Sequence, residues 1–358
     1  MRKNRKPFCY APWISLQYGS LIQSGGFTPC CEARWTGVKG SYESYLNSTR
    51  LNDFKIAHMR HDKDFINEVC ETCINLEKTT GVSTRTRLIE QVEQETFPYD
   101  LLSIVDYRPT NICNLKCRMC FPSNSSMIAK EQGITIDNNH INDIYGVDFS
   151  SVKVINIVGG EPSIDEHTDQ FLQWLIDNKN RHLRLSITTN ATNANDRWIN
   201  KLKQFGEVIV NISIDGTEKT YEYVRTNANW ESVRKNVEIY RNNFEVNFQI
   251  TGSMYNIPSI DEWLPWFLRN DFLFHLYPVE GHKHLSLAAL PDNIREEKIE
   301  YLTRLNDSRV DSAIDQLTST AFDKEIYNKF VEFTNKLDRM RNTDIRTVSS
   351  VYERIMND

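Results

Sequence analysis

The chain from about residue 99 onward alternates short apolar segments with amphipathic ones. The apolar segments are rich in Val and Ile, as buried strands are, and lie at residues 102–107, 152–158, 183–189, 208–214, 246–251 and 272–277. Helical patterns lie between them at residues 167–178, 196–205 and 230–242. This alternation predicts an α/β fold with a parallel sheet, and six such units suit an open, partial (β/α)6 TIM-like barrel.

The segments on either side of the α/β region have different patterns. Residues 1–98 contain scattered glycines and one convincing helix, near residues 44–61, so they predict a small cysteine-rich domain with little regular structure. Residues 291–358 show helical periodicity without glycine. The sequence therefore predicts three parts: an N-terminal domain at 1–98, the barrel at 99–290 and a helical C-terminal tail at 291–358.

Charge and cysteine content narrow the class of protein. The net charge of −6 makes nucleic acid an unlikely partner, and no apolar run is long enough to cross a membrane or to form a signal peptide. All eight cysteines lie within the first 120 residues, which is not how a disulfide scaffold distributes them. These features predict a cytoplasmic protein whose reduced cysteines bind metal.

Three of these cysteines, Cys113, Cys117 and Cys120, fall within eight residues, with the spacing C-x3-C-x2-C. They follow the first predicted strand, on the side of the sheet where parallel α/β folds place their active sites. Three thiolates suit a four-iron cluster with one iron left open to a small molecule, because an ordinary ferredoxin cluster takes four. A zinc knuckle with a distant fourth ligand is the alternative.

The second predicted strand runs into Gly159, Gly160, Glu161 and Pro162. Two glycines let a backbone approach a ligand closely, although an isolated Gly-Gly-Glu-Pro is more often a plain turn. Here the Gly-Gly-Glu-Pro segment follows the cysteine triplet by one βα unit. The two motifs together resemble the pattern of the radical S-adenosylmethionine (SAM) enzymes. The resemblance implies a [4Fe-4S] cluster on the triplet and a Gly-Gly-Glu-Pro segment that binds the SAM amino group.

The resemblance also implies roles for later residues. Asn190, in Thr-Thr-Asn after the third strand, and Ser213, at the end of the fourth, match positions that approach SAM. Arg225 could pair with the SAM carboxylate or be a surface helix charge, and Asp215 could touch the ligand or cap the following segment. Met119 stands where the family usually has an aromatic residue near the adenine, and a thioether can still pack against that ring.

The N-terminal cysteines form a second pattern. Cys9, Gly25, Cys30, Cys70 and Cys73 follow C-x15-G-x4-C…C-x2-C, which resembles the twitch domain, a shortened SPASM domain. The resemblance implies an auxiliary [4Fe-4S] cluster on the four cysteines, with Cys31 as a spare thiol. In most relatives this domain follows the barrel, whereas here it precedes it. Four cysteines also suit zinc, which stays open as an alternative.

The family resemblance implies reductive cleavage of SAM to a 5′-deoxyadenosyl radical, which takes a hydrogen atom from a peptide or small-molecule substrate. An electron donor such as flavodoxin or ferredoxin is implied too. The cysteine domain occupies the place of a leader-peptide-binding domain, so carbohydrate-like and nucleotide-like substrates stay open. The loop after the sixth strand holds further residues that could bind substrate or transfer protons: His275, Tyr277, Glu280, His282 and His284. Such side chains are more often structural or solvated.

Two other classes of function remain. A non-catalytic iron–sulfur protein for electron transfer or redox sensing would carry clusters but would not need the Gly-Gly-Glu-Pro motif. A zinc-stabilised binding module would be colourless and would leave the three-cysteine site without an obvious fourth ligand.

Overall fold

The computed structural model describes residues 6–19, 26–34, 37–94, 97–98, 100–136 and 141–357, so Gly25 lies outside the described residues. The chain divides into two compact units. The first contains the described residues up to Cys113, together with Pro122–Thr188 and Asn200–Val208. The second contains Asn114–Phe121, Thr189–Ile199 and the residues from Ile209 onward.

The first unit contains parallel strands that the sequence predicts. Strands β3 (Ile104–Tyr107), β5 (Val154–Ile157) and β6 (Arg184–Thr189) pair in parallel, in the order β6-β5-β3. The N-terminal segment extends this sheet, because β1 (Ser15–Tyr18) pairs in parallel with β3, and β2 (Phe27–Thr28) pairs antiparallel with β1. The sequence analysis did not predict these last two strands.

Helix α8 (Glu166–Asp177) covers one face of the strands of the first unit. Phe171, Leu172 and Leu175 recur at helical spacing and are completely buried, which places one stripe of the helix on the sheet. The ring of Phe171 lies 4.2 Å from that of Tyr107 on β3, measured between centroids. The same unit holds the short helix α7 (Ser126–Glu131).

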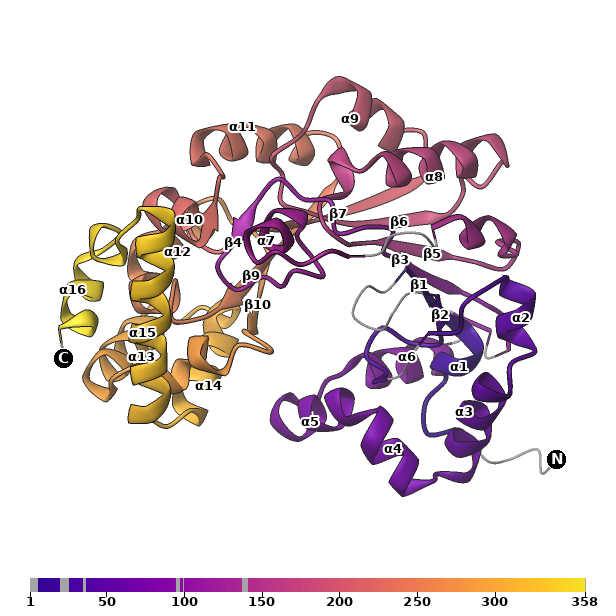
Figure 1. Ribbon diagram of the computed structural model, residues 1–358, viewed down its shortest axis with the longest axis horizontal. Helices are drawn as coiled ribbons and strands as arrows, with labels where there is room; N and C mark the ends of the chain where they lie inside the picture. The colour runs from indigo at the N-terminus through magenta and orange to yellow at the C-terminus, as the bar shows by residue number, and fades with distance from the viewer. Residues whose placement is uncertain are drawn as a thin grey trace. The chain divides into compact units, whose positions relative to one another are not determined.

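The N-terminal part is more regular than predicted. It contains α1 (Ala11–Ile14), α2 (Tyr42–Leu46), α3 (Thr49–Arg60), α4 (Lys63–Val69), α5 (Glu71–Thr80) and α6 (Thr84–Glu93) (Figure 1). The helix expected near residues 44–61 is present as α3, but the expectation that it is the one convincing helix of this region is wrong. Most of these helices are too short for a periodic pattern to show. Four of them begin where a side chain accepts a hydrogen bond from the first turn, at Ser41, Ser48, Asp62 and Ser83.

The second unit continues the strand–helix alternation. Strands β7 (Glu207–Ser213), β9 (Glu245–Gly252) and β10 (Phe274–Pro278) are parallel, in the order β10-β9-β7. The helices between strands are α9 (Asp196–Leu202), α10 (Glu218–Val224), α11 (Trp230–Arg241) and α12 (Ile260–Arg269). A separate antiparallel pair joins β4 (Lys116–Cys117) to β8 (Arg225–Thr226). The predicted strands and helices are confirmed to within a few residues.

The C-terminal tail is helical, as predicted. It contains α13 (Asp292–Leu305), α14 (Asp311–Ser319), α15 (Lys324–Arg341) and α16 (Ser350–Met356), coloured orange to yellow in Figure 1. Short 3-10 helices lie at Ile141–Gly146, Pro162–Ile164, Ile257–Ser259, Lys283–Leu285, Leu287–Ala289, Ser308–Val310 and Ile345–Thr347. The fold is thus mixed α/β with a mostly parallel sheet, as the sequence predicts.

Candidate functional site

The cysteine triplet lies on the loop that follows β3. Cys117 is in β4, where it pairs with Arg225 of β8, and the Cys120 amide donates to the Cys117 carbonyl at 3.1 Å. At Cys113, the amide donates to Ser126 Oγ at 3.1 Å, and that hydroxyl donates to the Cys113 carbonyl at 3.2 Å. The backbone at each of the three cysteines is therefore fixed by hydrogen bonds. Met119 is half-buried in the turn between Cys117 and Cys120.

Arg118, between the second and third cysteines, is buried and held by the C-terminal tail. Its Nη2 donates to Asp338 Oδ1 of α15 at 2.7 Å, and its Nε donates to the Tyr223 carbonyl at 2.9 Å. The guanidinium lies 3.6 Å from the centre of the Tyr223 ring. Arg341 of the same helix donates to the Lys116 carbonyl at 2.8 Å. The tail thus anchors the cysteine loop, a contact that the sequence analysis missed.

Arg225 is buried beside Cys117 and is not a surface charge, so that interpretation is wrong. Its Nη2 forms an ion pair with Asp215 Oδ2 at 2.7 Å, and its Nη1 donates to Cys117 Sγ at 3.8 Å. Burial raises the pKa of the Cys117 thiol, and the positive charge of Arg225 opposes that shift. Asp215 Oδ1 accepts from the Thr251 amide at 2.8 Å, and the N-cap of α10 is Thr217, so the capping interpretation of Asp215 is wrong.

The Gly-Gly-Glu-Pro segment is bonded to the chain that enters the cysteine loop. The Gly160 amide donates to the Thr110 carbonyl at 3.1 Å, and the Glu161 amide donates to the Ile112 carbonyl at 2.7 Å. A Cβ on Gly160 would lie 2.0 Å from that Ile112 oxygen, so only glycine permits this approach. Within the described residues, the close approach of Gly160 is therefore to the chain's own backbone.

The remaining residues of this segment are fixed locally. Gly159 has a φ of +139°, which other residues rarely adopt. Glu161 is buried, and its Oε1 accepts from the amide and hydroxyl of Ser163 at 3.0 and 2.6 Å. Pro162 is buried at the start of the 3-10 helix.

Asn190 contacts the cysteine loop directly. Its Nδ2 donates to Oδ1 of Asn114, the residue after Cys113, at 3.1 Å, and its own Oδ1 accepts from the Thr192 amide and hydroxyl. Asn114 Nδ2 donates to Thr192 Oγ1 at 2.9 Å, which closes the network. Ser213 is half-buried at the end of β7.

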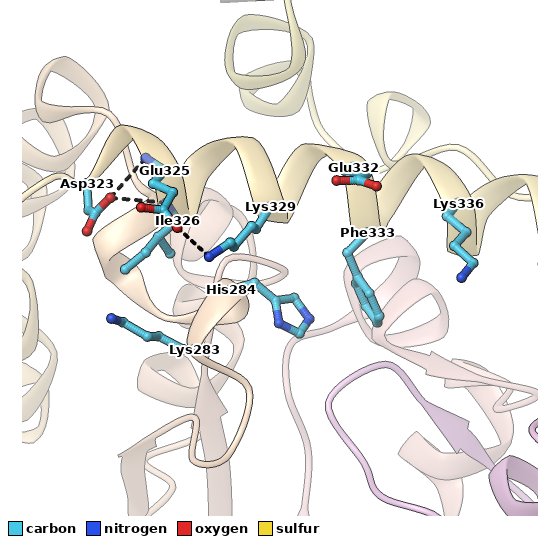
Figure 2. Close-up of a pocket in the computed structure, with 9 residues that line it drawn as sticks. All are labelled: Lys283, His284, Asp323, Glu325, Ile326, Lys329, Glu332, Phe333 and Lys336. Atoms are coloured by element: carbon cyan, nitrogen blue, oxygen red, sulfur yellow. Dashed lines mark hydrogen bonds and ion pairs between the residues drawn. The ribbon is translucent and has the colours of Figure 1, made fainter.

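The candidate residues of the loop after β10 fall into an exposed group and a packed group. His275, Tyr277 and Glu280 are exposed, whereas the His282 ring stacks on Phe121, the residue after Cys120, at 4.2 Å between centroids. Burial lowers the pKa of His282. The His284 ring points toward Phe333 of α15, 4.3 Å away (Figure 2).

His284 borders an open groove whose walls mix both charges. It is lined by Lys283, His284, Asp323, Glu325, Ile326, Lys329, Glu332, Phe333 and Lys336 (Figure 2). Lys329 pairs with Glu325 at 2.5 Å. Because lysines and acidic residues are equal in number, this groove does not select one sign of ligand charge.

The four N-terminal cysteines of the second pattern line one small cavity in the first unit: Cys9, Cys30, Cys70 and Cys73. Two of them accept backbone hydrogen bonds at sulfur, Cys9 from the Ala11 amide and Cys30 from the Glu32 amide, both at 3.4 Å. Burial raises the pKa of Cys9 to about 12 and that of Cys70 to about 12. These thiols need a partner charge, such as a metal, to ionise near neutral pH.

His58 and Arg85 also line this cavity, and sequence reasoning missed both. His58 Nε2 lies 3.8 Å from Cys70 Sγ, and burial lowers the pKa of His58 to about 4. Arg85 pairs with Glu77 and stacks over the Phe8 ring at 4.4 Å. Cys31 is not among the lining residues; its thiol donates to Glu32 Oε1 at 3.8 Å and lies beside Asp106.

Two kinds of feature are absent from the described residues. In those ranges no three His, Cys, Asp or Glu side chains converge on a single-ion site. Nor does any described helix have the length and hydropathy to cross a membrane.

Comparison with known proteins identifies the central region. Residues 107–265 match the sequence model of the radical SAM superfamily. Residues 107–265 thus resemble a radical SAM superfamily domain. This domain includes the cysteine triplet, the Gly-Gly-Glu-Pro segment and Arg225. Members of this superfamily are SAM-dependent iron–sulfur enzymes, which agrees with the expectation from the motifs.

Relatives match over part of their length. An uncharacterised protein of Methanocaldococcus jannaschii is 27% identical over 198 residues, which cover 52% of this chain and 66% of that protein. The GTP 3′,8-cyclase of Aliarcobacter butzleri is 29% identical over 32% of this chain and 36% of the cyclase. Among solved structures, anSMEcpe with bound AdoMet has 17% identity and a TM-score of 0.43, over 57% of this chain and 59% of that one.

Proposed function

We propose that this protein is a radical SAM enzyme whose SAM-binding [4Fe-4S] cluster is held by Cys113, Cys117 and Cys120. The observation that carries the proposal is the hydrogen bonding of Gly160 and Glu161 to Thr110 and Ile112, just before Cys113. It joins the backbone of the second motif to the start of the cysteine loop. The three cysteines fall within eight residues, so the chain itself keeps them close.

The donor set fits this cofactor. Three cysteines supply three thiolates, and the buried Nε of Arg225 has no hydrogen-bond partner among the described residues. We assign Arg225 to the SAM carboxylate and the segment Gly159–Pro162 to its amino group. Asn190, Ser213 and Met119 complete the contacts, with Met119 against the adenine.

When bound, the cluster and SAM supply reductive cleavage to a 5′-deoxyadenosyl radical, which abstracts a hydrogen atom from the substrate. The residues of this chain hold SAM, orient it and exclude water. Arg225 balances the charge of the Cys117 thiolate, and the buried Arg118–Asp338 pair keeps the loop rigid. The electron donor is a small carrier such as flavodoxin or ferredoxin, and the protein works in the cytoplasm.

A second cluster belongs in the N-terminal cavity. Cys9, Cys30, Cys70 and Cys73 line that cavity, and two of their sulfurs accept backbone hydrogen bonds, as ligands of iron–sulfur clusters commonly do. In this proposal residues 1–98 form a twitch-type domain ahead of the barrel at 99–290, and residues 291–358 form the extension. Zinc on the same four cysteines is the alternative, and metal analysis separates the two.

The substrate is a peptide or a small molecule. A non-catalytic electron carrier or redox sensor is the second candidate function, since two clusters would suit it. The Gly-Gly-Glu-Pro segment favours the enzyme, because electron transfer alone has no need for a SAM contact.

The test is SAM cleavage by anaerobically purified protein, reconstituted with iron and sulfide and given dithionite. We expect 5′-deoxyadenosine from the wild type and none from Cys117→Ala. Bound iron without SAM binding would overturn the enzyme proposal and favour the electron carrier. Zinc in place of iron would overturn both.

A further inference from the structure

A row of polar side chains crosses the sheet of the first unit. The strand register places Gln17 opposite Asp106, Asp106 opposite Asn156, and Asn156 opposite Ser186. Opposed residues of paired strands point to the same face, so these four, here called the polar row, share one face of β1, β3, β5 and β6. The radical SAM motifs do not account for this row.

The other face of the same strands is entirely apolar at the neighbouring positions. Leu16, Val105, Ile155 and Leu185 are 0 to 1% exposed. On the polar face, Asn156 and Ser186 are only half-buried. A parallel sheet covered on both faces normally carries apolar residues on both. Ile104 and Val154, two positions earlier on the same face, pack against the apolar N-terminal cluster, so this face is apolar there and polar along the row. The half-buried polar groups of the row would suit a polar ligand.

Asp106 is the charged member of the row and is buried. Asn156 Nδ2 donates to its Oδ1 at 2.6 Å. Burial raises the pKa of Asp106, while the bond from Asn156, the charge of Arg108 and the Cys31 thiol oppose the shift. A buried carboxylate is costly unless hydrogen bonds and cations compensate it, so a further donor on a ligand would be stabilising there.

Cys31 links the polar row to the N-terminal cavity. Its thiol lies beside Asp106, and the preceding residue, Cys30, lines the cavity. One peptide bond therefore separates a candidate ligand of the auxiliary cluster from a neighbour of the polar row. A molecule on the row would lie close to that cluster.

We infer that the polar row is the floor of the substrate site, with Asp106 as its anchor, for a small hydroxyl-rich molecule that carries an amino group. This deepens the proposed function and rests on it. Asn156 and Ser186 are half-buried and offer an amide and a hydroxyl beside the Asp106 carboxylate, whereas the Gln17 amide is buried and bonded to Thr28. These groups pair with O–H and N–H donors. The Asp106 carboxylate repels a polyanion such as a nucleoside triphosphate, and the polar side chains of the row give the apolar side chains of a peptide no matching surface.

The test is equilibrium binding to the reconstituted protein with SAM, using glucosamine, glucose, GTP and a short cysteine-containing peptide as probes. We expect glucosamine to bind more tightly than glucose, and GTP and the peptide not to bind. Asp106→Asn should weaken glucosamine binding about tenfold, the loss of one charged hydrogen bond. Ser186→Ala should weaken it by a smaller factor, and Asp177→Asn, at the end of α8, should not change it.

Tighter binding of GTP or of the peptide, or no binding of glucosamine, would overturn the substrate class. Unchanged binding by folded Asp106→Asn and Ser186→Ala would overturn the site. Failure of this inference is distinct from failure of the proposed function, because Cys117→Ala should lose SAM cleavage and keep probe binding. SAM cleavage without any glucosamine binding would leave the enzyme proposal intact and remove this one.

Discussion

The two cysteine-bearing regions differ in what surrounds the sulfur atoms. The loop with Cys117 and Cys120 is held by buried charges: Arg225 lies 3.8 Å from Cys117 Sγ, and Arg118 pairs with Asp338 at 2.7 Å. The N-terminal cavity is bordered by helices and apolar side chains, and burial raises the pKa of Cys9 and of Cys70 to about 12. The loop is held by buried charge pairs, whereas the cavity is lined mainly by cysteine and apolar side chains, with the Arg85–Glu77 pair at its border.

This difference shows how each region can keep its shape. Ion pairs and β4–β8 pairing fix the loop, so it can offer three ligands and leave one coordination position open. The N-terminal cavity brings Cys9, Cys30, Cys70 and Cys73 together from three separate segments of the first unit. A bound cluster would crosslink these segments and supply folding free energy to this region.

The largest expected effect is a loss of activity, and it distinguishes the cysteine loop from the N-terminal cavity. Cys117→Ala should abolish formation of 5′-deoxyadenosine, because a cluster with two ligands cannot be held with its open iron. Iron in the N-terminal cavity should remain, at about half the wild-type content. Cys31→Ala is the matched control and should keep the full iron content. Normal SAM cleavage by Cys117→Ala would remove the cluster assignment.

The converse variant tests the N-terminal region. Cys70→Ala with Cys73→Ala should remove about half of the iron and leave SAM binding in place, since these residues line only the N-terminal cavity. Iron analysis and the SAM-dependent change in the electron paramagnetic resonance spectrum measure the two outcomes. An iron content equal to that of the wild type would show that this cavity holds no iron–sulfur cluster.

Local signals in the sequence predicted much of this molecule. The six apolar runs are strands, although polar residues interrupt them at positions such as Asp106 and Asn156. The cysteine triplet and Gly-Gly-Glu-Pro were found from spacing alone. The Arg118–Asp338 pair could not be, because 220 positions separate its members and no pattern joins them. The sequence left Arg225 open between a SAM contact and a surface charge for a similar reason, since its partners, Asp215 and Cys117, come from other elements.

The polar row illustrates the same limit. Asp106 and Asn156 each stand alone inside an apolar run, where the sequence gives no sign that they are neighbours. Only the register of β3 and β5 brings them together. The short N-terminal helices were missed because Ser and Asp caps, and not amphipathic periodicity, mark their starts.

The buried charge pair of the loop predicts a large loss of stability. Asp338→Ala should lower the free energy of unfolding by about 3–5 kcal/mol, because Arg118 is left as an uncompensated buried charge. Asp338→Asn retains a hydrogen-bond acceptor and should lose less. Glu332→Gln, on the exposed side of the same helix, should change stability by less than about 0.5 kcal/mol. Urea unfolding measures all three, and equal values would contradict the anchoring role of α15.

The backbone contact of the Gly-Gly-Glu-Pro segment predicts a somewhat smaller loss of stability. Gly160→Ala should destabilise the protein by about 3 kcal/mol, because the new Cβ would meet the Ile112 carbonyl, a backbone atom that cannot turn aside. Gly206→Ala is the matched control, since the nearest atom to its Cβ is 3.7 Å away, an ordinary contact. If both variants unfold at the same urea concentration, the two motifs are not in backbone contact.

The smallest expected effect is a pH dependence of the stability of the metal-free protein, caused by His58 in the N-terminal cavity. Burial, with smaller contributions from the charges of His61 and Arg85, lowers the pKa of His58 from 6.5 to about 4. Between these values the unfolded state binds a proton that the folded state does not, so stability is full above pH 6.5 and falls as the pH drops. From pH 6.5 to 5 the loss is about 1.6 kcal/mol.

His58→Phe isolates this dependence, because it keeps an aromatic ring against Phe54, whose centroid lies 4.6 Å from that of His58, and removes the titrating group. Carboxylates elsewhere contribute equally to both proteins, so the difference between their urea unfolding curves at the two pH values reports His58 alone. The variant should therefore lose less stability on acidification than the wild type. Parallel losses would mean that water reaches His58 and that the cavity is not the apolar environment that distinguishes it from the cysteine loop.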